Sequence, residues 1–335
     1  MISIFAHPKP FRGHIGVTQR NAIGSWKQLS PDCEIFLFGN EEGTREVAKE
    51  FGIHHVPDIA RNDFGRPFLS DIFKKGEQLA TRAVHCYVNC DIILGHEMSD
   101  AIKRVKEWSE RFLIVGQCWD LDVTDPIAFN QNTWENDLKA FVAKKGTVRG
   151  PWSIDYFVFS RGLYGELPPF TLGSCYFDNW LIWKAKELGV PVLNATKAVL
   201  AVHQNHDYAY VAGGKDTTAF GVEAVRNLQH AGGPAHCYAI SQSSHNLLAT
   251  TIRRNWKGYL PRGFHREPLK AWAERMAARK AGLKIQVTAI SERLMKYRVK
   301  PLFWRFMVRT QRARHALGLN GRNLGRIFSL YRKNQ

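Results

Sequence analysis

Two polar side chains interrupt a predicted buried strand in the stretch CYVNCDIIL. Asn89 and Asp91 lie between apolar, partly β-branched residues. A carboxylate at the end of a buried strand is costly unless a cation meets it. Hard oxygen ligands of this kind suit Mg²⁺ or Mn²⁺, and such an ion usually bridges a carboxylate to phosphates. The motif therefore indicates a cation site, and the alternative is a structural Asx turn that caps a strand.

A literal D-x-D motif occurs at Asp120 and Asp122. Its C-terminal flank is polar, which is typical of a solvated loop at the mouth of a site. We expect these two carboxylates to bind acceptor hydroxyls, together with Asp155 near the start of a later predicted strand. The motif is also a second candidate for the metal site.

The segment HQNHDY follows a buried strand and contributes His203 and His206. Two imidazoles three positions apart can ligate a metal or hydrogen-bond a diphosphate. Isolated H-x-x-H pairs are more often satisfied or exposed histidines. The segment lacks the glutamate and the helical frame of an H-E-x-x-H zinc protease.

Asp178 begins a predicted amphipathic helix. Aspartate is a preferred helix N-cap, worth ~1 kcal/mol, so a capping role is one interpretation. Its aromatic neighbours Tyr176, Phe177 and Trp180 favour another. An apolar setting raises the pKa of a carboxylate toward the range of a general base.

Strand and helix signals alternate along the first 100 residues and must position these side chains. This alternation predicts βαβ crossovers and a mostly parallel sheet, where ligands bind beyond the carboxyl ends of the strands. His7, Lys9, Asn40, Asn89 and Asp91 all fall at such ends. The predicted strands are 2–6, 34–38, 54–56 and two short runs within 87–94, and the predicted helices are 18–29, 41–51 and 68–83.

The second half of the chain is less regular. We expect strands at 111–117, 154–159, 190–193 and 198–202, and a helix at 178–188. No P-loop, G-x-G-x-x-G or G-x-S-x-G motif is present, which disfavours P-loop, dinucleotide-binding and α/β-hydrolase proteins.

The positive charge is concentrated at one end of the chain. The net charge is +17, yet residues 253–335 hold 22 basic and 3 acidic residues, whereas 1–252 hold 25 and 27. We therefore predict a near-neutral domain, 1–252, and a basic region, 253–335. We see no signal peptide, no long apolar run and no C-x-x-C pair, and we expect a cytoplasmic protein with reduced cysteines.

The basic region alternates arginine and lysine with aromatic residues, as in PLFWRFMVRTQRARHALGL. Such amphipathic helices suit an anionic membrane surface, which would place the protein on the inner face of the cytoplasmic membrane. The alternative is a helical subdomain that packs its aromatic residues on the core. Nucleic-acid binding ranks last, because no recognised motif supports it.

Eight segments in register resemble a bacterial family of GT-A-type glycosyltransferases close to the family-2 type. The resemblance covers roughly residues 2–240 and continues into VEAVRNLQHAGG. It is carried by FAHPKPFRGHIGVTQRNAIGSW, EIFLFGNEEG, RNDFGRPFLSDIF, YVNCDIIL, VGQCWDLDVTDP, IDYFVFSRG, FDNWLIWKAKELGVPVLNAT and HQNHDYAY.

The resemblance implies an α/β fold of the GT-A type, with a Rossmann-like, mostly parallel sheet flanked by helices and a basic, mainly helical C-terminal extension. It implies transfer of a sugar from a nucleotide-diphospho-sugar to a glycan or lipid-linked acceptor, as in polysaccharide and cell-envelope biosynthesis. Two rival hypotheses stay open: a sugar-phosphate nucleotidyltransferase, and a non-catalytic basic nucleic-acid-binding protein.

The resemblance also implies roles for the residues introduced above. Asp91 matches the metal-binding carboxylate, for Mg²⁺ or Mn²⁺, and Asn89 replaces the first Asp of D-x-D. His203 or His206 matches a late histidine near the metal and diphosphate. Asp178 matches the general base of inverting enzymes, with Phe177 in place of the usual Glu. The expected donor-binding residues are His7, Lys9, Asn40, Arg61 and Asn89.

Overall fold

The computed structural model describes residues 1–206 and 221–259. The chain divides into a compact unit, Met1–Tyr259, and a second unit, Leu260–Gln335, which lies outside the described residues together with the expected basic helices. The strand Ile252–Arg254 belongs to the sheet of the first unit and spans the predicted boundary after residue 252.

The N-terminal half alternates strands and helices, as predicted. Parallel pairing joins β1 to both β2 and β4, and β2 to β3, so each crossover passes through a helix. The elements are β1 (Ser3–Ala6), α1 (Gly13–Gln28), β2 (Glu34–Phe38), α2 (Thr44–Phe51), β3 (His54–Val56), α3 (Leu69–Leu79) and β4 (Val84–Val88).

The second half adds strands to the same sheet and builds a smaller one. Its elements are β5 (Ile92–Leu94), α4 (Glu97–Trp108), β6 (Leu113–Val115), β7 (Trp119–Leu121), α5 (Trp134–Lys145), β8 (Thr147–Val148), β9 (Tyr156–Ser160), α6 (Phe177–Glu187), β10 (Val192–Asn194), β11 (Ala201–Gln204), α8 (Val222–His230), β12 (His245–Leu247) and β13 (Ile252–Arg254). Three short 3₁₀ turns, η1 (Pro234–His236), η2 (Ile240–Gln242) and η3 (Trp256–Tyr259), flank the last two strands.

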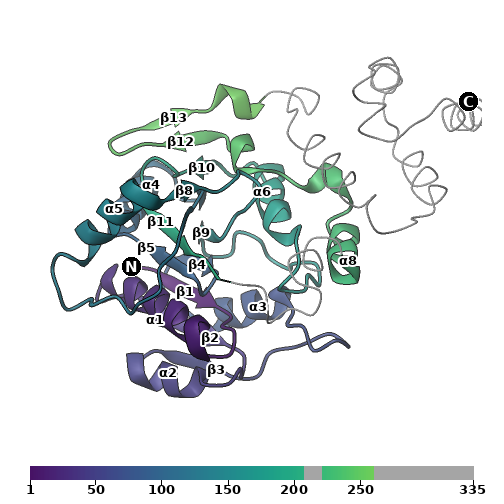
Figure 1. Cartoon of the computed structure of the whole chain (residues 1–335). Helices are drawn as coiled ribbons and strands as arrows, with labels where there is room; N and C mark the ends of the chain where they lie inside the picture. The colour runs from purple at the N-terminus through teal and green to yellow at the C-terminus, as the bar shows by residue number, and fades with distance from the viewer. Residues whose placement is uncertain (207–220, 260–335) are drawn as a thin grey trace, which may run out of the picture. The chain divides into compact units, whose positions relative to one another are not determined.

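The large sheet has nine strands in the order β13-β12-β10-β6-β9-β4-β1-β2-β3 (Figure 1). Strand β9 is antiparallel to β4 and β6, and β13 is antiparallel to β12, while the remaining pairs are parallel. A second, four-stranded sheet has the order β5-β11-β7-β8. The predicted architecture, a mostly parallel α/β sheet flanked by helices, is confirmed for the described residues.

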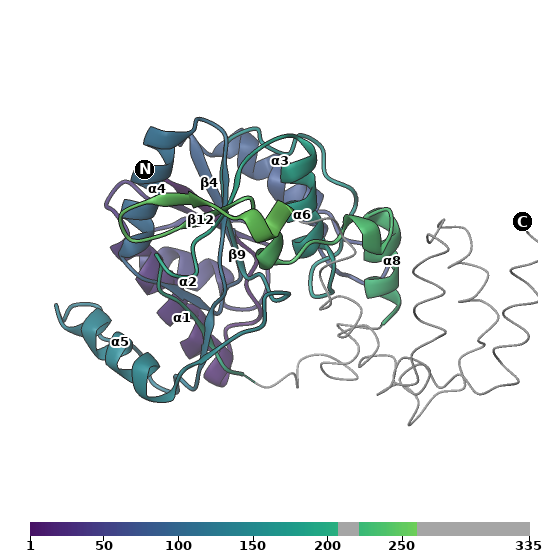
Figure 2. The ribbon, with the colours of Figure 1, turned by 90° about the horizontal axis from the view of Figure 1, so that it is seen from above.

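Helices cover both faces of the large sheet (Figure 2). Successive strand residues point to opposite faces, so Ile4 belongs to the core cluster that includes residues of α1, α2 and α4, and Phe5 to the cluster that includes residues of α3 and α6. Gly76 lets α3 approach the sheet closely, because a Cβ atom there would lie 2.5 Å from the Phe5 ring. Strands buried on both faces explain the continuous apolar runs of the sequence.

None of the six cysteines is paired in a disulfide; Cys86, Cys90 and Cys118 are buried in the core, and Cys33, Cys175 and Cys237 are partly buried. Within the described residues, no helix is both long and apolar enough to cross a membrane.

Candidate active site

The stretch CYVNCDIIL forms a strand, a tight turn and a second strand. β4 ends at Val88, the N–H of Ile92 donates to the carbonyl of Asn89 at 3.1 Å, and β5 begins at Ile92. β5 then pairs with β11, and the N–H of Gln204 donates to the Asp91 carbonyl at 3.1 Å. Asp91 is thereby fixed beside the end of β11, at the carboxyl edge of β4.

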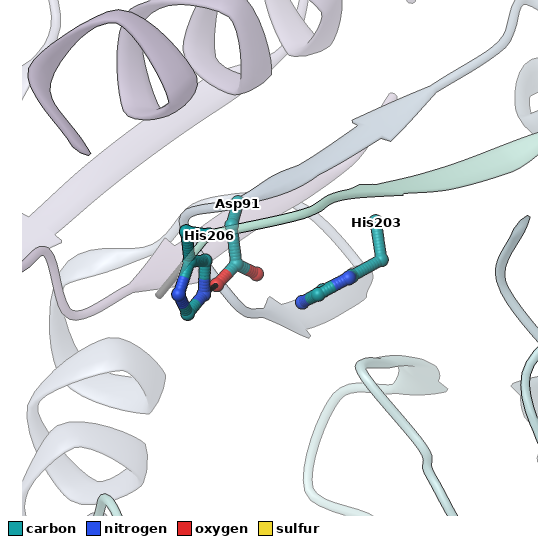
Figure 3. A group of neighbouring side chains, drawn as sticks. All are labelled: Asp91, His203 and His206. Carbon is teal, nitrogen blue, oxygen red and sulfur yellow. Dashed lines mark hydrogen bonds and ion pairs between the residues drawn. The ribbon is translucent and has the colours of Figure 1, made fainter. Parts of the chain in front are cut away.

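Asp91, His203 and His206 converge at this point. One ligand atom from each residue lies within 4.8 Å of the other two. The Asp91 carboxylate lies between the two imidazole rings (Figure 3). Asp91 and His203 are each only 8% exposed. The structure therefore brings together all three residues that were predicted to hold the metal.

The Asp91 carboxylate also contacts a cation from the segment that follows β1. Lys9 Nζ lies 3.3 Å from Asp91 Oδ2. His206 Nε2 lies 3.0 Å from the same oxygen. Burial alone would raise the pKa of Asp91, but the Lys9 charge and the two histidines hold it well below its usual value. Asp91 is thus a carboxylate at any physiological pH.

These residues fit a divalent metal. Asp91 Oδ1 is buried and has no hydrogen-bond partner among the described residues, so it retains lone pairs for a cation. One carboxylate with two imidazoles is a softer ligand set than the all-oxygen set that Mg²⁺ prefers. The site therefore suits Mn²⁺ better than Mg²⁺.

Asp120 corrects a prediction. The polar flank of its motif indicated a solvated loop, but Asp120 lies in strand β7, opposite His203 of β11. Trp119 and Leu121 supply the apolar contacts that hold β7 in the small sheet. Asp120 Oδ1 lies 2.8 Å from His203 Nδ1 without hydrogen-bond geometry, so this carboxylate is an ion-pair neighbour of a candidate metal ligand. Asp122 is exposed and accepts a hydrogen bond from Asn205 Nδ2 at 2.8 Å.

Arg149 joins two of the predicted acceptor-binding carboxylates. Its guanidinium lies 3.6 Å from Asp120 Oδ1 and 3.5 Å from Asp155 Oδ2. Asp155 in turn accepts from the Asn89 side-chain amide at 3.0 Å, and its carbonyl accepts from the Asn89 N–H at 3.0 Å. The amide nitrogen of Asn89, predicted to contact the donor, therefore orients Asp155.

A second polar cluster lies beyond β1 and β2. Glu41 Oε1 accepts from Arg61 Nη2 at 2.6 Å and lies 3.2 Å from His7 Nε2. Although burial would raise the pKa of Glu41, its contacts with His7 and Arg61 lower it to about 2. Gly39 permits this close packing, because a Cβ atom there would lie 2.4 Å from the Glu41 carboxylate. His7 and Arg61 are thus brought together, and Asn40 is exposed next to them.

Asp178 is the second residue of α6, and Tyr176 occupies the N-cap position, so Asp178 is not the N-cap. The N–H of Tyr176 donates to Asp178 Oδ1 at 3.0 Å. Tyr176 has φ +86°, the one positive φ of a non-glycine residue among the described residues. Burial, with a smaller contribution from the Asp155 carboxylate, raises the pKa of Asp178 to about 7. A carboxyl with this pKa is suited to proton transfer near neutral pH.

Three contributors were not predicted from the sequence. Arg149 and Glu41 carry no motif, and their roles follow from tertiary contacts alone. Gln19 of α1 accepts from the Lys9 N–H at 2.6 Å and donates to the Lys9 carbonyl at 2.8 Å. The only signal for Gln19 was its position near the start of the predicted helix 18–29.

No protein-family model matches the chain, and neither does any curated protein. Among solved structures, it is similar to Mycobacterium tuberculosis glucosyl-3-phosphoglycerate synthase in complex with Mg²⁺ and UDP. That similarity has 15% identity and a TM-score of 0.42, and covers 77% of this chain and 91% of the other. The complex of that enzyme with Mn²⁺, UDP-glucose and phosphoglyceric acid has 15% identity, a TM-score of 0.43, and covers 77% and 90%.

S. aureus TarS, residues 1–349, is similar over 36% of each chain, at 9% identity and a TM-score of 0.29. Identities and TM-scores this low do not carry an activity from one protein to another. The function has to follow from the residues of this chain.

Proposed function

We propose that this protein is a metal-assisted glycosyltransferase that moves a sugar from a nucleotide-diphospho-sugar to a hydroxyl acceptor. The main support is the convergence of Asp91, His203 and His206 beside Lys9 at the carboxyl edge of the sheet. In an open α/β sheet, this edge is where nucleotides bind. A cation site with an adjacent ammonium suits a diphosphate that leaves with increasing negative charge.

The donor half of the site draws on β1, β2 and β4. Asp91, His203 and His206 would hold a divalent metal, Mn²⁺ or Mg²⁺, which when bound would supply positive charge against the leaving diphosphate. Lys9 supplies a further positive charge for that diphosphate. His7 and Arg61, held together by Glu41, form the proposed contact with the nucleoside, with Asn40 exposed beside them.

The acceptor half requires a base. Asp178 accepts the proton of the attacking hydroxyl, and its raised pKa allows it to hold that proton near neutral pH. The Tyr176 N–H fixes the orientation of the carboxylate. Direct displacement with such a base inverts the anomeric centre. We propose that Asp120, Asp122 and Asp155 shape the acceptor side, with a glycan or lipid-linked acceptor for a protein that docks peripherally on the membrane.

Thermal stability with nucleotides and metal tests this function. We expect Mn²⁺ together with one class of nucleotide sugar, or its nucleoside diphosphate, to raise the melting temperature more than either alone. Asp91→Asn should remove the joint effect. Stabilisation by a nucleoside triphosphate with a sugar 1-phosphate, and not by nucleotide sugars, would instead identify a nucleotidyltransferase.

A further inference from the structure

The Lys9 ammonium contacts two of the three candidate metal ligands. Lys9 Nζ lies 3.3 Å from Asp91 Oδ2 and 3.1 Å from His206 Nε2. Asp91 Oδ1 stays open, but His206 Nε2 has a single lone pair, which Lys9 and a metal cannot both use. Two cations held this close would also repel each other. Lys9 and a divalent metal are therefore alternatives at His206 Nε2.

The proton position on His206 supports this conclusion. Nε2 cannot donate to Asp91 and accept from Lys9 at once. The Asp91 carboxylate favours an Nε2–H, whereas Lys9 favours a bare Nε2 lone pair, so the two neighbours compete for the same ring nitrogen. Neutral imidazole with a bare nitrogen is the form that ligates a metal. A metal at Nε2 would therefore replace the contact of this nitrogen with Lys9.

The side chain of Lys9 can move while its backbone stays fixed. Gln19 holds the Lys9 backbone through two hydrogen bonds, of 2.6 and 2.8 Å, to its N–H and carbonyl. The Lys9 side chain is 27% exposed, so a path to solvent exists beside the site. Its four-carbon stem allows the ammonium to swing away from Asp91 without unfolding β1 or α1.

We propose that Lys9 is a tethered cation that holds Asp91 and His206 in the absence of metal and is displaced to the donor diphosphate when metal binds. This inference rests on the proposed function for the identity of the phosphate ligand. Displacement of Lys9 couples metal binding to diphosphate binding. Metal alone must displace the Lys9 ammonium into solvent, whereas metal together with a diphosphate offers the ammonium a new partner. Metal binding is therefore weak alone and strengthened by nucleotide.

The test measures Mn²⁺ binding directly, by the loss of the free Mn²⁺ electron paramagnetic resonance signal, with and without UDP, GDP or ADP. In the unmodified chain, we expect at least one nucleotide to tighten Mn²⁺ binding about tenfold. In Lys9→Met, Mn²⁺ should bind about tenfold tighter without nucleotide, because its competitor is gone. In this variant, nucleotide should then leave Mn²⁺ affinity almost unchanged.

Two matched variants distinguish competition by the Lys9 ammonium from a general effect of positive charge on Mn²⁺ binding. Lys27→Met removes one positive charge from a lysine that contacts the Phe51 carbonyl at the end of α2, and should leave Mn²⁺ binding unchanged. Lys9→Arg keeps a cation at the site and should bind Mn²⁺ about as weakly as the unmodified chain. Melting curves in a chelator check that each variant is folded.

The outcomes distinguish this inference from the proposed function. Mn²⁺ binding by Lys9→Met that equals or falls below that of the unmodified chain, with nucleotide binding intact, overturns the role of Lys9 alone. Failure of the unmodified chain to bind Mn²⁺ under any nucleotide condition overturns the proposed function, and this inference with it.

Discussion

His203 of β11 and Asp120 of β7 are direct cross-strand neighbours, with Nδ1 of the imidazole 2.8 Å from Oδ1 of the carboxylate. The parallel register of the two strands sets this contact. A carboxylate this close to one ring nitrogen favours a proton there and leaves the other nitrogen as a metal ligand. The small sheet therefore positions a candidate metal ligand together with an acidic neighbour.

Asp91 and Asp120 should affect metal binding to different degrees. Asp91→Asn removes the only carboxylate of the candidate ligand set, and we expect it to abolish Mn²⁺ binding and sugar transfer. Asp120→Asn loses a supporting contact, so Mn²⁺ affinity should fall about 10–100-fold without disappearing. Titration of Mn²⁺ in the presence of nucleotide measures both effects.

Asp125→Asn is the matched control for these two variants, since Asp125 is an exposed carboxylate on the segment after β7. It should leave Mn²⁺ affinity unchanged. If Asp120→Asn abolished binding and Asp91→Asn did not, the metal site would belong to the D-x-D motif instead.

The pKa of Asp178 predicts the pH dependence of transfer. Because the pKa is raised to about 7, the carboxylate form of the base grows as pH rises through 7. We expect kcat/KM to increase from pH 6 to pH 8 and then to level. Asp178→Asn should lower kcat by about two orders of magnitude or more and remove this limb of the profile.

Stability gives an independent check on Asp178. A carboxyl whose pKa is raised in the folded state stabilises the fold below its unfolded pKa, and this stabilisation is lost as pH rises toward the folded pKa. The free energy of unfolding should therefore fall, relative to Asp178→Asn, between about pH 4 and pH 7. A constant difference across that range would show that the pKa of Asp178 is not raised.

Arg149 should matter for stability because it is largely buried between two carboxylates. Its side chain is 14% exposed, and that of Asp155 is 11% exposed. Arg149→Met leaves these acidic groups without their shared cation, and we expect a loss of about 2 kcal/mol in the free energy of unfolding. Chemical denaturation measures it.

Arg12→Met provides the comparison for Arg149. Arg12 pairs with Glu42 at the surface, where solvent screens the interaction. Arg12→Met should lower the free energy of unfolding much less than Arg149→Met does. Equal effects of the two substitutions would contradict the bridging role of Arg149.

The basic region after Tyr259 should direct the protein to anionic surfaces. We expect the full chain to bind vesicles that contain anionic lipid and to be released by salt, since exposed charges are screened over about 8 Å at physiological ionic strength. A chain that ends at Tyr259 keeps β13 and should still bind nucleotide and Mn²⁺, but not vesicles. Flotation of both chains with anionic and neutral vesicles measures this.

Equal vesicle binding by the two chains would assign the attraction to residues 1–259. Absence of binding by the full chain at low salt would favour the alternative, that the aromatic residues of 260–335 pack within the protein.

Local patterns predicted much of the sheet. The strands Glu34–Phe38 and His54–Val56 were predicted to the residue, because Gly39 ends the first and Pro57 ends the second. The turn at Asn89 and Asp91 was predicted because these two polar residues interrupt an apolar run. Helix α4 was not predicted, although Met98, Ala101, Ile102 and Val105 are buried at helical spacing. In α5, only Trp134, Leu138 and Val142 are buried, a stripe too narrow to stand out among polar residues.

Site residues could be predicted from the sequence only where an aspartate or histidine with metal-binding chemistry lies at the end of a predicted strand. Asp91, His203 and His206 meet that condition. The contacts of Arg149 with Asp120 and Asp155 join segments that only the sheet order brings together. Strand β7 was obscured because it is three residues long and its polar flank begins at Asp122.

The double attachment of Asn89 to Asp155 makes one amide group a reporter for the whole site. Asp155 directly precedes β9, the antiparallel strand that separates β4 from β6, so the two hydrogen bonds join a residue proposed to contact the donor to one proposed to shape the acceptor side. A shift of Asn89 against Asp155 would stretch them. The side-chain amide resonances of Asn89 in ¹⁵N-labelled protein would therefore register the arrival of metal, nucleotide or acceptor, including ligands that produce no turnover.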